Sequence, residues 1–194
     1  PTASRNAPDR RATSRAKSPS RFRLRPLICA RMRALRLTAI LGPVLRFHSR
    51  SPDATRSAAG LLAAALPREG LLVVLSGPLG AGKTLFAKGL AQGLGVAPDA
   101  VTSPTFAICS EYALADGRRL AHLDGYRLES TAELECVGFL DLLVAGTIVL
   151  IEWGERFRDA LPADRLEIKI SRPGEPPTHR RLDAVASGPA AARA

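Results

Sequence analysis

The chain has 194 residues, 46% of them hydrophobic, which suits one folded domain with a buried core. No apolar run approaches the roughly 18–20 residues that a membrane-spanning helix needs, so we expect no membrane association. Residues 1–50 hold 13 Lys or Arg and one acid, Asp9, whereas the remainder carries −2 of the net +10. The basic charge therefore gives no support for a nucleic-acid-binding face on the folded domain.

Residues 1–46 are expected to form a disordered basic tail, because they are rich in Arg, Ser, Pro and Ala and have no sustained hydrophobic period. An RNA-binding arm and an organelle transit peptide are two interpretations of such a segment. The third, which we favour, is that it is not part of the functional protein, since the only methionine is Met32. Three cysteines without metal-like spacing indicate a reducing, cytoplasmic setting.

The first ordered element is expected to begin at Ser51, in "SPDATRSAAGLLAAAL". Ser51 can cap a helix with Pro52 at its first position, and residues 67–70 end it. The continuous apolar run "LLVVLS", residues 71–76, is typical of a strand buried on both faces of a parallel sheet. A second helix is expected over residues 83–93.

Further elements follow in the second half of the chain. "TFAICSEYALADGRRLAHLD" predicts two strands around an Asp116-Gly117 turn. "STAELECVGFLDLLVAG" predicts one helix from Ser130 or Thr131, with Gly146 after its end. "TIVLIEW" predicts a second buried strand, and "DRLEIKIS" and "RRLDAVAS" predict alternating strands that pair near a sheet edge. Buried strands with helices between them indicate an α/β fold.

The segment "GPLGAGKT", residues 77–84, lies between a predicted strand and a predicted helix, which is the context of a phosphate-binding P-loop. Its glycines let backbone amides turn toward phosphate oxygens, and the helix N-terminus adds partial positive charge. Lys83 is expected to reach the β- and γ-phosphates, and Thr84 to place its hydroxyl on Mg²⁺. The alternative, a chance glycine-rich turn, does not explain why Lys and Thr follow. The predicted phosphate-binding residues are Gly80, Ala81, Gly82, Lys83, Thr84 and Leu85.

Two acids close apolar segments and are candidates for the chemistry. Glu152 ends "IVLIE", and because Mg²⁺ prefers oxygen ligands, it is the predicted metal partner of Thr84. Asp124 in "AHLDGYR" is the candidate for orienting an attacking water or the metal shell. Its alternative role is that of a turn-forming Asp before Gly125.

Three classes of protein carry such a loop or such a tail. A guanine-specific GTPase is excluded, because no Asn-Lys-x-Asp segment is present. A small-molecule kinase is weakened but stays open, since the arginines after Lys83 are scattered and nothing obvious would hold a phosphoryl acceptor. A basic RNA-binding protein would rest on the tail alone.

The ordered segments resemble the TsaE family of small bacterial ATPases over about residues 51–186. The P-loop is shared with many families, but "SPTF", then H-x-D-x-Y-R, then E-W in this order is more specific. The resemblance implies a single P-loop NTPase domain with a mixed, largely parallel central sheet flanked by helices. It also implies ATP and Mg²⁺ as cofactors and a role in threonylcarbamoylation of the adenosine beside the tRNA anticodon. The ATPase would act on the TsaB–TsaD heterodimer and meet tRNA only through that complex.

The resemblance assigns roles to particular positions. Lys83, Asp124 and Glu152 would be catalytic, and Trp153 would lie near the nucleotide, with an aromatic cap on the core as its alternative. Ser103 to Phe106 match a switch-like segment near the γ-phosphate, which makes Ser103 and Thr105 nucleotide-binding candidates, and Arg180 matches an Arg close to the nucleotide. The ATPase domain is expected to span residues 47–187, and residues 188–194 to form a disordered C-terminal tail.

Two positions depart from the family pattern. Pro78 replaces the usual Asp and removes one backbone N–H from the loop. Gly125 stands where a larger apolar residue is usual, and we expect it to loosen the turn that presents Asp124. Both departures bear on the rate of hydrolysis more than on nucleotide binding.

Overall fold

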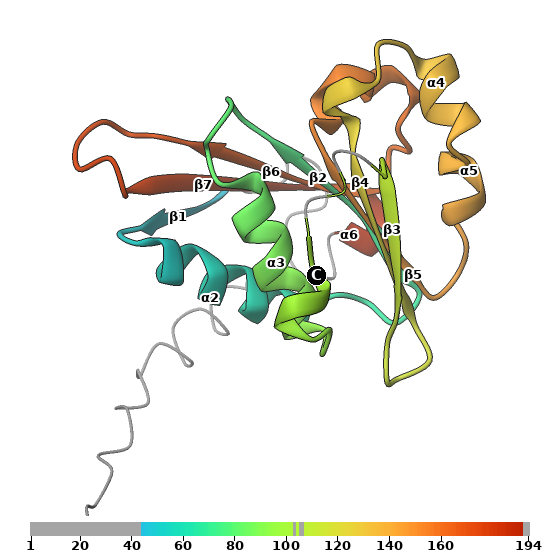
Figure 1. Cartoon of the computed structure of the whole chain (residues 1–194), viewed down its shortest axis with the longest axis horizontal. Coiled ribbons are helices and arrows are strands. Elements are labelled where there is room, and N and C mark those ends of the chain that lie inside the picture. The colour runs from blue at the N-terminus through green and yellow to red at the C-terminus, as the bar shows by residue number, and fades with distance from the viewer. Residues whose placement is uncertain (1–43, 103, 105–106, 192–194) are drawn as a thin grey trace, which may run out of the picture.

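A seven-stranded sheet forms the centre of the computed structural model, which describes residues 44–102, 104 and 107–191 (Figure 1). The strand order is β1-β7-β6-β2-β5-β4-β3. The inner strands pair in parallel, β2 with β5 and β6, and β4 with β5, whereas the pairs β1–β7, β6–β7 and β3–β4 are antiparallel. The predicted mixed, largely parallel α/β sheet is confirmed. The strands are β1 Leu45–Ser49, β2 Gly70–Ser76, β3 Cys109–Ala113, β4 Arg119–Asp124, β5 Thr147–Glu152, β6 Arg165–Ser171 and β7 Arg180–Ser187.

Helices cover both faces of the sheet, so that two apolar layers form. Alternate residues of β2 divide between them: Val73 and Leu75 pack on the side of α2 and α3, and Leu72 and Val74 on the side of α4 and α5. This division is why the β2 sequence is apolar throughout. The helices are α2 Pro52–Ala63, α3 Lys83–Gly93, α4 Thr131–Cys136, α5 Phe139–Leu142 and α6 Gly188–Ala191, with short 3₁₀ helices η2 Pro98–Ala100, η3 Gly125–Arg127 and η4 Gly154–Ala160.

Helix α3, which follows the P-loop, is held closely against α2. A Cβ added at Gly89 would lie 2.4 Å from the carbonyl oxygen of Arg56, and one at Gly93 would lie 2.6 Å from that of Gly60. The two backbones therefore meet at glycines, where no side chain separates them. Ser51 caps α2 as predicted, since its Oγ accepts from the amide of Ala54 at 3.1 Å. The close contact between α2 and α3 supports the helix that follows the P-loop.

The chain enters the sheet earlier than the sequence predicts. Strand β1 begins at Leu45, ahead of the boundary expected at residue 47 and of the helix expected to open the fold. Its outward positions are Arg46 and His48, which resemble a continuation of the basic tail, whereas Phe47 packs on the core and lies opposite Leu182 of β7. β1 therefore takes the edge predicted for β6 and β7. Residues 1–43, expected to be a disordered tail, lie outside the described residues.

The single helix expected from residue 130 is wrong. Ser130 caps α4, its Oγ accepting from the amide of Glu133 at 3.2 Å, but the helix ends at Cys136 and α5 begins at Phe139. Gly138 lies between them with φ of 79°, a left-handed conformation that ends an α-helix. The apolar positions on either side, Leu134 and Phe139, are both buried, so the hydrophobic pattern continues across the break.

The C-terminal tail expected at residues 188–194 also needs correction. Residues 188–191 form α6, and the amide of Ala191 donates to Asp164 Oδ1 at 3.0 Å. Ala191 is buried in the layer that contains α2 and α3. Small side chains with little hydrophobic signal hide this contact in the sequence. Residues 192–194 lie outside the described residues, and across 44–102, 104 and 107–191 no helix has the length and apolar character to cross a bilayer.

Candidate nucleotide-binding site

The loop of residues 77–82 leaves the carboxyl end of β2 and enters α3 at Lys83. Gly80 and Gly82 have φ of 70° and 107°, so the loop turns in a way that other residues rarely adopt. Gly82 is the N-cap of α3, and no side chain caps this helix. The first amides of a helix have no intrahelical partner, so they place partial positive charge at the helix N-terminus, where the loop joins α3. The loop therefore fits a phosphate group.

Lys83 lies inside this loop, although no anion is needed to hold it there. Its Nζ donates to the carbonyl oxygens of Gly77 at 2.7 Å and Pro78 at 3.1 Å. The same ammonium lies 3.4 Å from the centroid of the Trp153 ring, a cation–π contact. Burial lowers the pKa of Lys83 below its ordinary value, and nearby carboxylates, Glu152 foremost, oppose that shift. Trp153 thus contacts the site directly.

The carboxyl ends of three strands bring the predicted polar residues together. Asp124 and Glu152 face each other across β4 and β5, and Leu75 of β2 pairs with Glu152 on its other side. Thr84 Oγ1 donates to Glu152 Oε2 at 2.9 Å. A hydroxyl and a carboxylate are hard oxygen donors that suit Mg²⁺. Among the described residues no cluster of three or more His, Cys, Asp or Glu could hold a metal ion.

Asp124 has the turn-forming role weighed from the sequence. It is buried, and its Oδ1 accepts from the amide of Tyr126 at 3.0 Å, which caps the 3₁₀ turn η3. This bond is the turn-forming role. Its place beside Glu152 also suits the predicted part in catalysis, which stays a prediction.

Gly125 is packed tightly, so the expected loosening of its turn is wrong. A Cβ at this position would lie 2.8 Å from Cε2 of Phe157 and 3.2 Å from the carbonyl oxygen of Glu152. Arg156 Nη1 donates to the carbonyl oxygens of Gly125 at 3.1 Å and Tyr126 at 2.5 Å. The Phe157 ring occupies the space that a larger residue 125 would fill, and the turn keeps its support.

We expect Gly125→Leu to destabilise the apo protein by about 1–3 kcal/mol, because the new side chain overlaps the Phe157 ring. Denaturant unfolding measures this loss. The double variant Gly125→Leu, Phe157→Ala should recover part of it, since the smaller residue 157 vacates the space. Equal stability of Gly125→Leu and the wild type would contradict the tight packing.

Pro78 fits the loop with the carbonyl it retains. This carbonyl accepts from the amide of Ala81 at 3.1 Å in addition to Lys83 Nζ. The preceding amide, that of Gly77, donates to Glu155 Oε1 at 3.3 Å. The N–H that Pro78 lacks is not one of the amides from Gly80 onward, and the effect of Pro78 on hydrolysis stays a prediction.

Two arginines clamp the outer side of the loop. Arg180 Nε donates to the carbonyl oxygen of Ala81 at 2.7 Å, and Arg172 Nη2 donates to that of Gly80 at 2.8 Å. Arg180 thus lies beside the loop, and its expected place near a nucleotide stays a prediction. Arg172 and Glu155 were not predicted, because Arg172 follows β6 and Glu155 follows β5, and the placement of these strands on either side of β2 is not visible in a local pattern.

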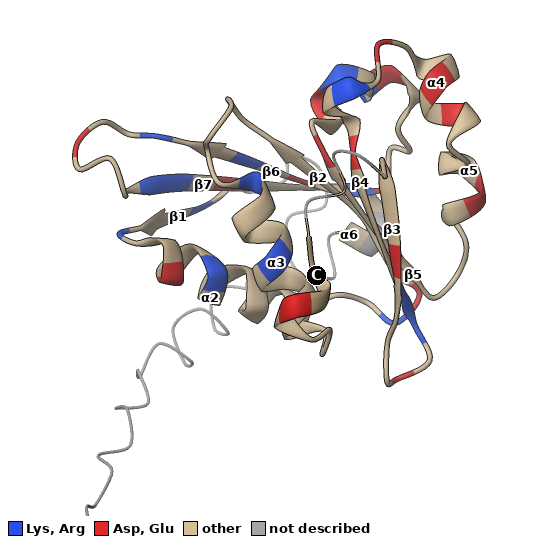
Figure 2. Cartoon of the chain, in the orientation of Figure 1, with Lys and Arg blue, Asp and Glu red and all other residues tan. Residues whose placement is uncertain are grey.

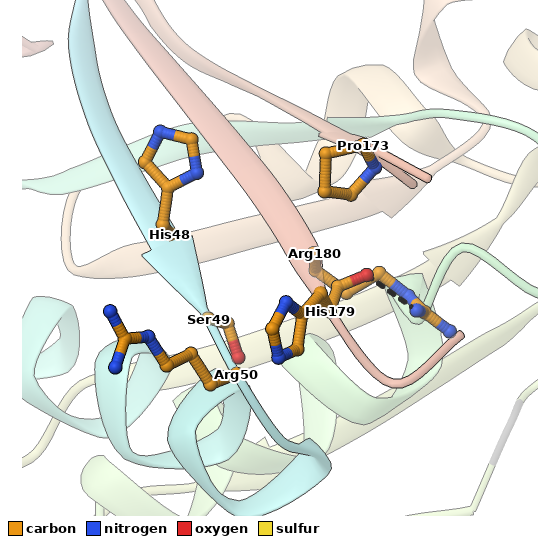
Figure 3. Close-up of a pocket in the computed structure, with 6 residues that line it drawn as sticks. All are labelled: His48, Ser49, Arg50, Pro173, His179 and Arg180. Atoms are coloured by element: carbon orange, nitrogen blue, oxygen red, sulfur yellow. Dashed lines mark hydrogen bonds between the residues drawn. The ribbon is translucent and has the colours of Figure 1, made fainter. Parts of the chain in front are cut away.

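A pocket of about 520 Å³ lies beside this clamp (Figure 3). Arg180 belongs both to the pocket and to the loop contact, so the pocket adjoins the P-loop. Figure 2 shows basic residues on α3 and β7, whereas α4 and α5 carry acids. No acid among the described residues lines the pocket, whose lining residues are His48, Ser49, Arg50, Pro173, His179 and Arg180.

The remaining candidates fall in two groups. Leu85 lies in the first turn of α3, next to Thr84. Ser103 and Thr105, with Phe106 of the predicted switch-like segment, lie outside the described residues. His122, part of the H-x-D-x-Y-R motif but without an assigned role, contacts Glu152.

Comparisons with known proteins place these features in a family. The family model described as "Threonylcarbamoyl adenosine biosynthesis protein TsaE" matches residues 49–182. The tRNA threonylcarbamoyladenosine biosynthesis protein TsaE of Streptomyces coelicolor is 47% identical over 111 residues, 56% of this chain and 74% of that protein. Its Bacillus subtilis counterpart is 40% identical over 132 residues, 68% of this chain and 80% of that protein. The crystal structure of Bacillus subtilis YdiB aligns with a TM-score of 0.57 and 34% identity, covering 77% of this chain and 90% of that one.

Proposed function

Because the chain belongs to the TsaE family, we propose that it acts in the biosynthesis of threonylcarbamoyladenosine in tRNA. We propose further that it is a Mg²⁺-dependent ATPase whose cycle serves repeated turnover of a TsaB–TsaD transferase. One observation carries the ATPase proposal: Thr84 of the P-loop helix and Glu152 of β5 share a hydrogen bond at the mouth of a glycine loop that encloses Lys83.

The chain's own groups divide the work of binding. The loop amides and the N-terminus of α3 receive the phosphates, and Lys83 exchanges its carbonyl partners for phosphate oxygens. Thr84 and Glu152 would hold Mg²⁺, which when bound would neutralise charge on the phosphate oxygens. The pocket that Arg180 lines adjoins the loop and would offer room for the nucleoside end.

Hydrolysis needs a positioned water in addition to bound phosphates. Asp124 lies beside Glu152, and its backbone is held by the η3 turn and by its amide, which donates to the carbonyl oxygen of Ile108 at 2.9 Å. We propose that its carboxylate orients the attacking water. A carboxylate at this place is fixed by β4, so it needs no loop movement to reach the site.

The proposal is tested by reconstitution with TsaB and TsaD, a threonylcarbamoyl donor and tRNA. Addition of the protein with ATP and Mg²⁺ should turn a single round of modification into many, as measured by modified nucleoside per TsaD. A protein that binds ATP but gives no stimulation would contradict the proposal. A phosphorylated metabolite formed from ATP would favour the small-molecule kinase instead.

Arg180→Ala is expected to weaken ATP binding about tenfold, because the loss of a charged hydrogen bond to Ala81 frees the outer side of the loop. Calorimetric titration measures the affinity. The matched control is Arg118→Ala, which removes the same charge far from the site. Arg118 precedes β4, at the end of the strand away from Asp124, and pairs with Asp116. Equal affinities of the two variants would remove Arg180 from the site.

A further inference from the structure

His122 is a buried polar residue in a layer that is otherwise apolar around it. It lies on β4 opposite Leu150 of β5, with Leu120 two residues before it on the same face. Its side chain is 1% exposed, and that of Glu152 is 2% exposed. A residue needed for packing alone would be apolar here, as Leu120 and Leu150 are. The imidazole therefore invites an explanation beyond packing.

The contact between His122 and Glu152 supplies that explanation. His122 Nε2 lies 3.0 Å from Glu152 Oε1, and Thr84 Oγ1 donates to the other oxygen, Oε2. Both oxygens of the carboxylate are thus engaged, one from the sheet and one from α3. With two fixed contacts, the plane of the carboxylate is defined before any ligand arrives.

The remaining nitrogen shows what the arrangement favours. An ionised carboxylate accepts hydrogen bonds only, so with Glu152 in that form the donor of this contact would be His122 Nε2. His122 Nδ1 is buried and has no hydrogen-bond partner within the described residues. Within the described residues this nitrogen is unpaired while both oxygens of Glu152 are engaged, and an unpaired buried polar atom costs stability.

We propose that His122 is a positioning residue that holds Glu152 in the orientation in which it receives Mg²⁺ with Thr84. The inference rests on the proposed function, because it assigns the metal to Glu152. His122 does not touch the nucleotide or the metal. It acts by fixing Oε1 of Glu152, while the Thr84 hydroxyl holds Oε2.

The test compares His122→Gln with His122→Asn. A glutamine amide reaches about as far as imidazole Nε2 and keeps a donor for Glu152, whereas the asparagine amide is one methylene shorter and falls short. Both variants bury an amide, so the loss of packing is similar. The readout is the Mg²⁺ concentration needed to tighten nucleotide binding, followed by fluorescence of Trp153, the only tryptophan in the chain.

We expect the Mg²⁺ requirement of His122→Asn to rise about tenfold or more, and that of His122→Gln to stay within about threefold of the wild type. Nucleotide affinity in EDTA should be equal in all three proteins. Equal Mg²⁺ requirements for the two variants, raised or not, would overturn the positioning role.

A second measurement keeps the inference testable if His122→Asn unfolds. In the Glu152→Gln background, where the metal-binding carboxylate is gone, His122→Gln should change the residual Mg²⁺ requirement by less than about twofold. A larger change there would show that His122 acts apart from Glu152. A wild-type protein whose nucleotide binding ignores Mg²⁺ would instead contradict the proposed function itself.

Discussion

Replacing Lys83 with alanine should lower the rate of ATP hydrolysis by about 100-fold or more, the loss typical of one preorganised donor to developing charge. The effect is large because the ammonium is enclosed, with Gly77 and Pro78 carbonyls and the Trp153 ring around it. No other lysine or arginine donates inside the loop among the described residues, since Arg172 and Arg180 bond its outer carbonyls. Phosphate release measured at saturating ATP and Mg²⁺ tests this expectation.

The matched control for this variant is Lys88→Ala, which removes the same charge from the same helix, one turn and a half further on. Its hydrolysis rate should stay within about twofold of the wild type. The melting temperature of apo Lys83→Ala should also stay close to that of the wild type, because the two freed carbonyls lie at a loop that solvent can reach. Normal hydrolysis by Lys83→Ala would remove the P-loop assignment.

Glu152→Gln should abolish the Mg²⁺ stimulation of hydrolysis, again by about 100-fold, while the fold persists. The substitution removes the charge proposed to bind the metal, but glutamine keeps the shape of the side chain. A glutamine can still accept from Thr84 Oγ1, and its amide can donate to His122 if the imidazole changes tautomer. Hydrolysis as a function of Mg²⁺ concentration, together with thermal unfolding of the apo protein, measures both effects.

Glu152→Ala is the less informative change, although it removes the same charge. It would remove the one hydrogen bond that the buried His122 side chain makes among the described residues. We expect this loss to cost about 1–3 kcal/mol of apo stability. Glu135→Gln, an exposed acid on α4, is the control for the glutamine variant and should behave as the wild type. Unchanged Mg²⁺ stimulation in Glu152→Gln would place the metal elsewhere.

Much of the central architecture is predictable from the sequence because the signals are local. The apolar runs of β2 and β5, the Ser51 cap of α2 and the hairpin turn at Asp116-Gly117 each depend on a few neighbouring residues. Their outcomes agree with the structure. The α/β class follows from these elements alone.

The parts that escaped prediction depend on long-range pairing or on weak local contrast. β1 is too short and too basic to separate from the tail before it, and its partner β7 lies more than 130 residues away. Gly138 is a single residue that breaks an otherwise helical pattern. The roles of Arg172 and His122 emerge only when β6 and β4 are placed beside β2 and β5.

The contacts that surround the Lys83 ammonium have a consequence for selectivity among anions. The ammonium already has three favourable neighbours, two carbonyl oxygens and an aromatic ring, so an incoming anion gains only the difference in contact energy. A small ion such as inorganic phosphate offers few contacts to repay that exchange, whereas a nucleoside triphosphate adds those of its base, sugar and further phosphates. If the loop binds a nucleoside triphosphate as proposed, it should therefore discriminate by ligand size and stay available in a phosphate-rich solution.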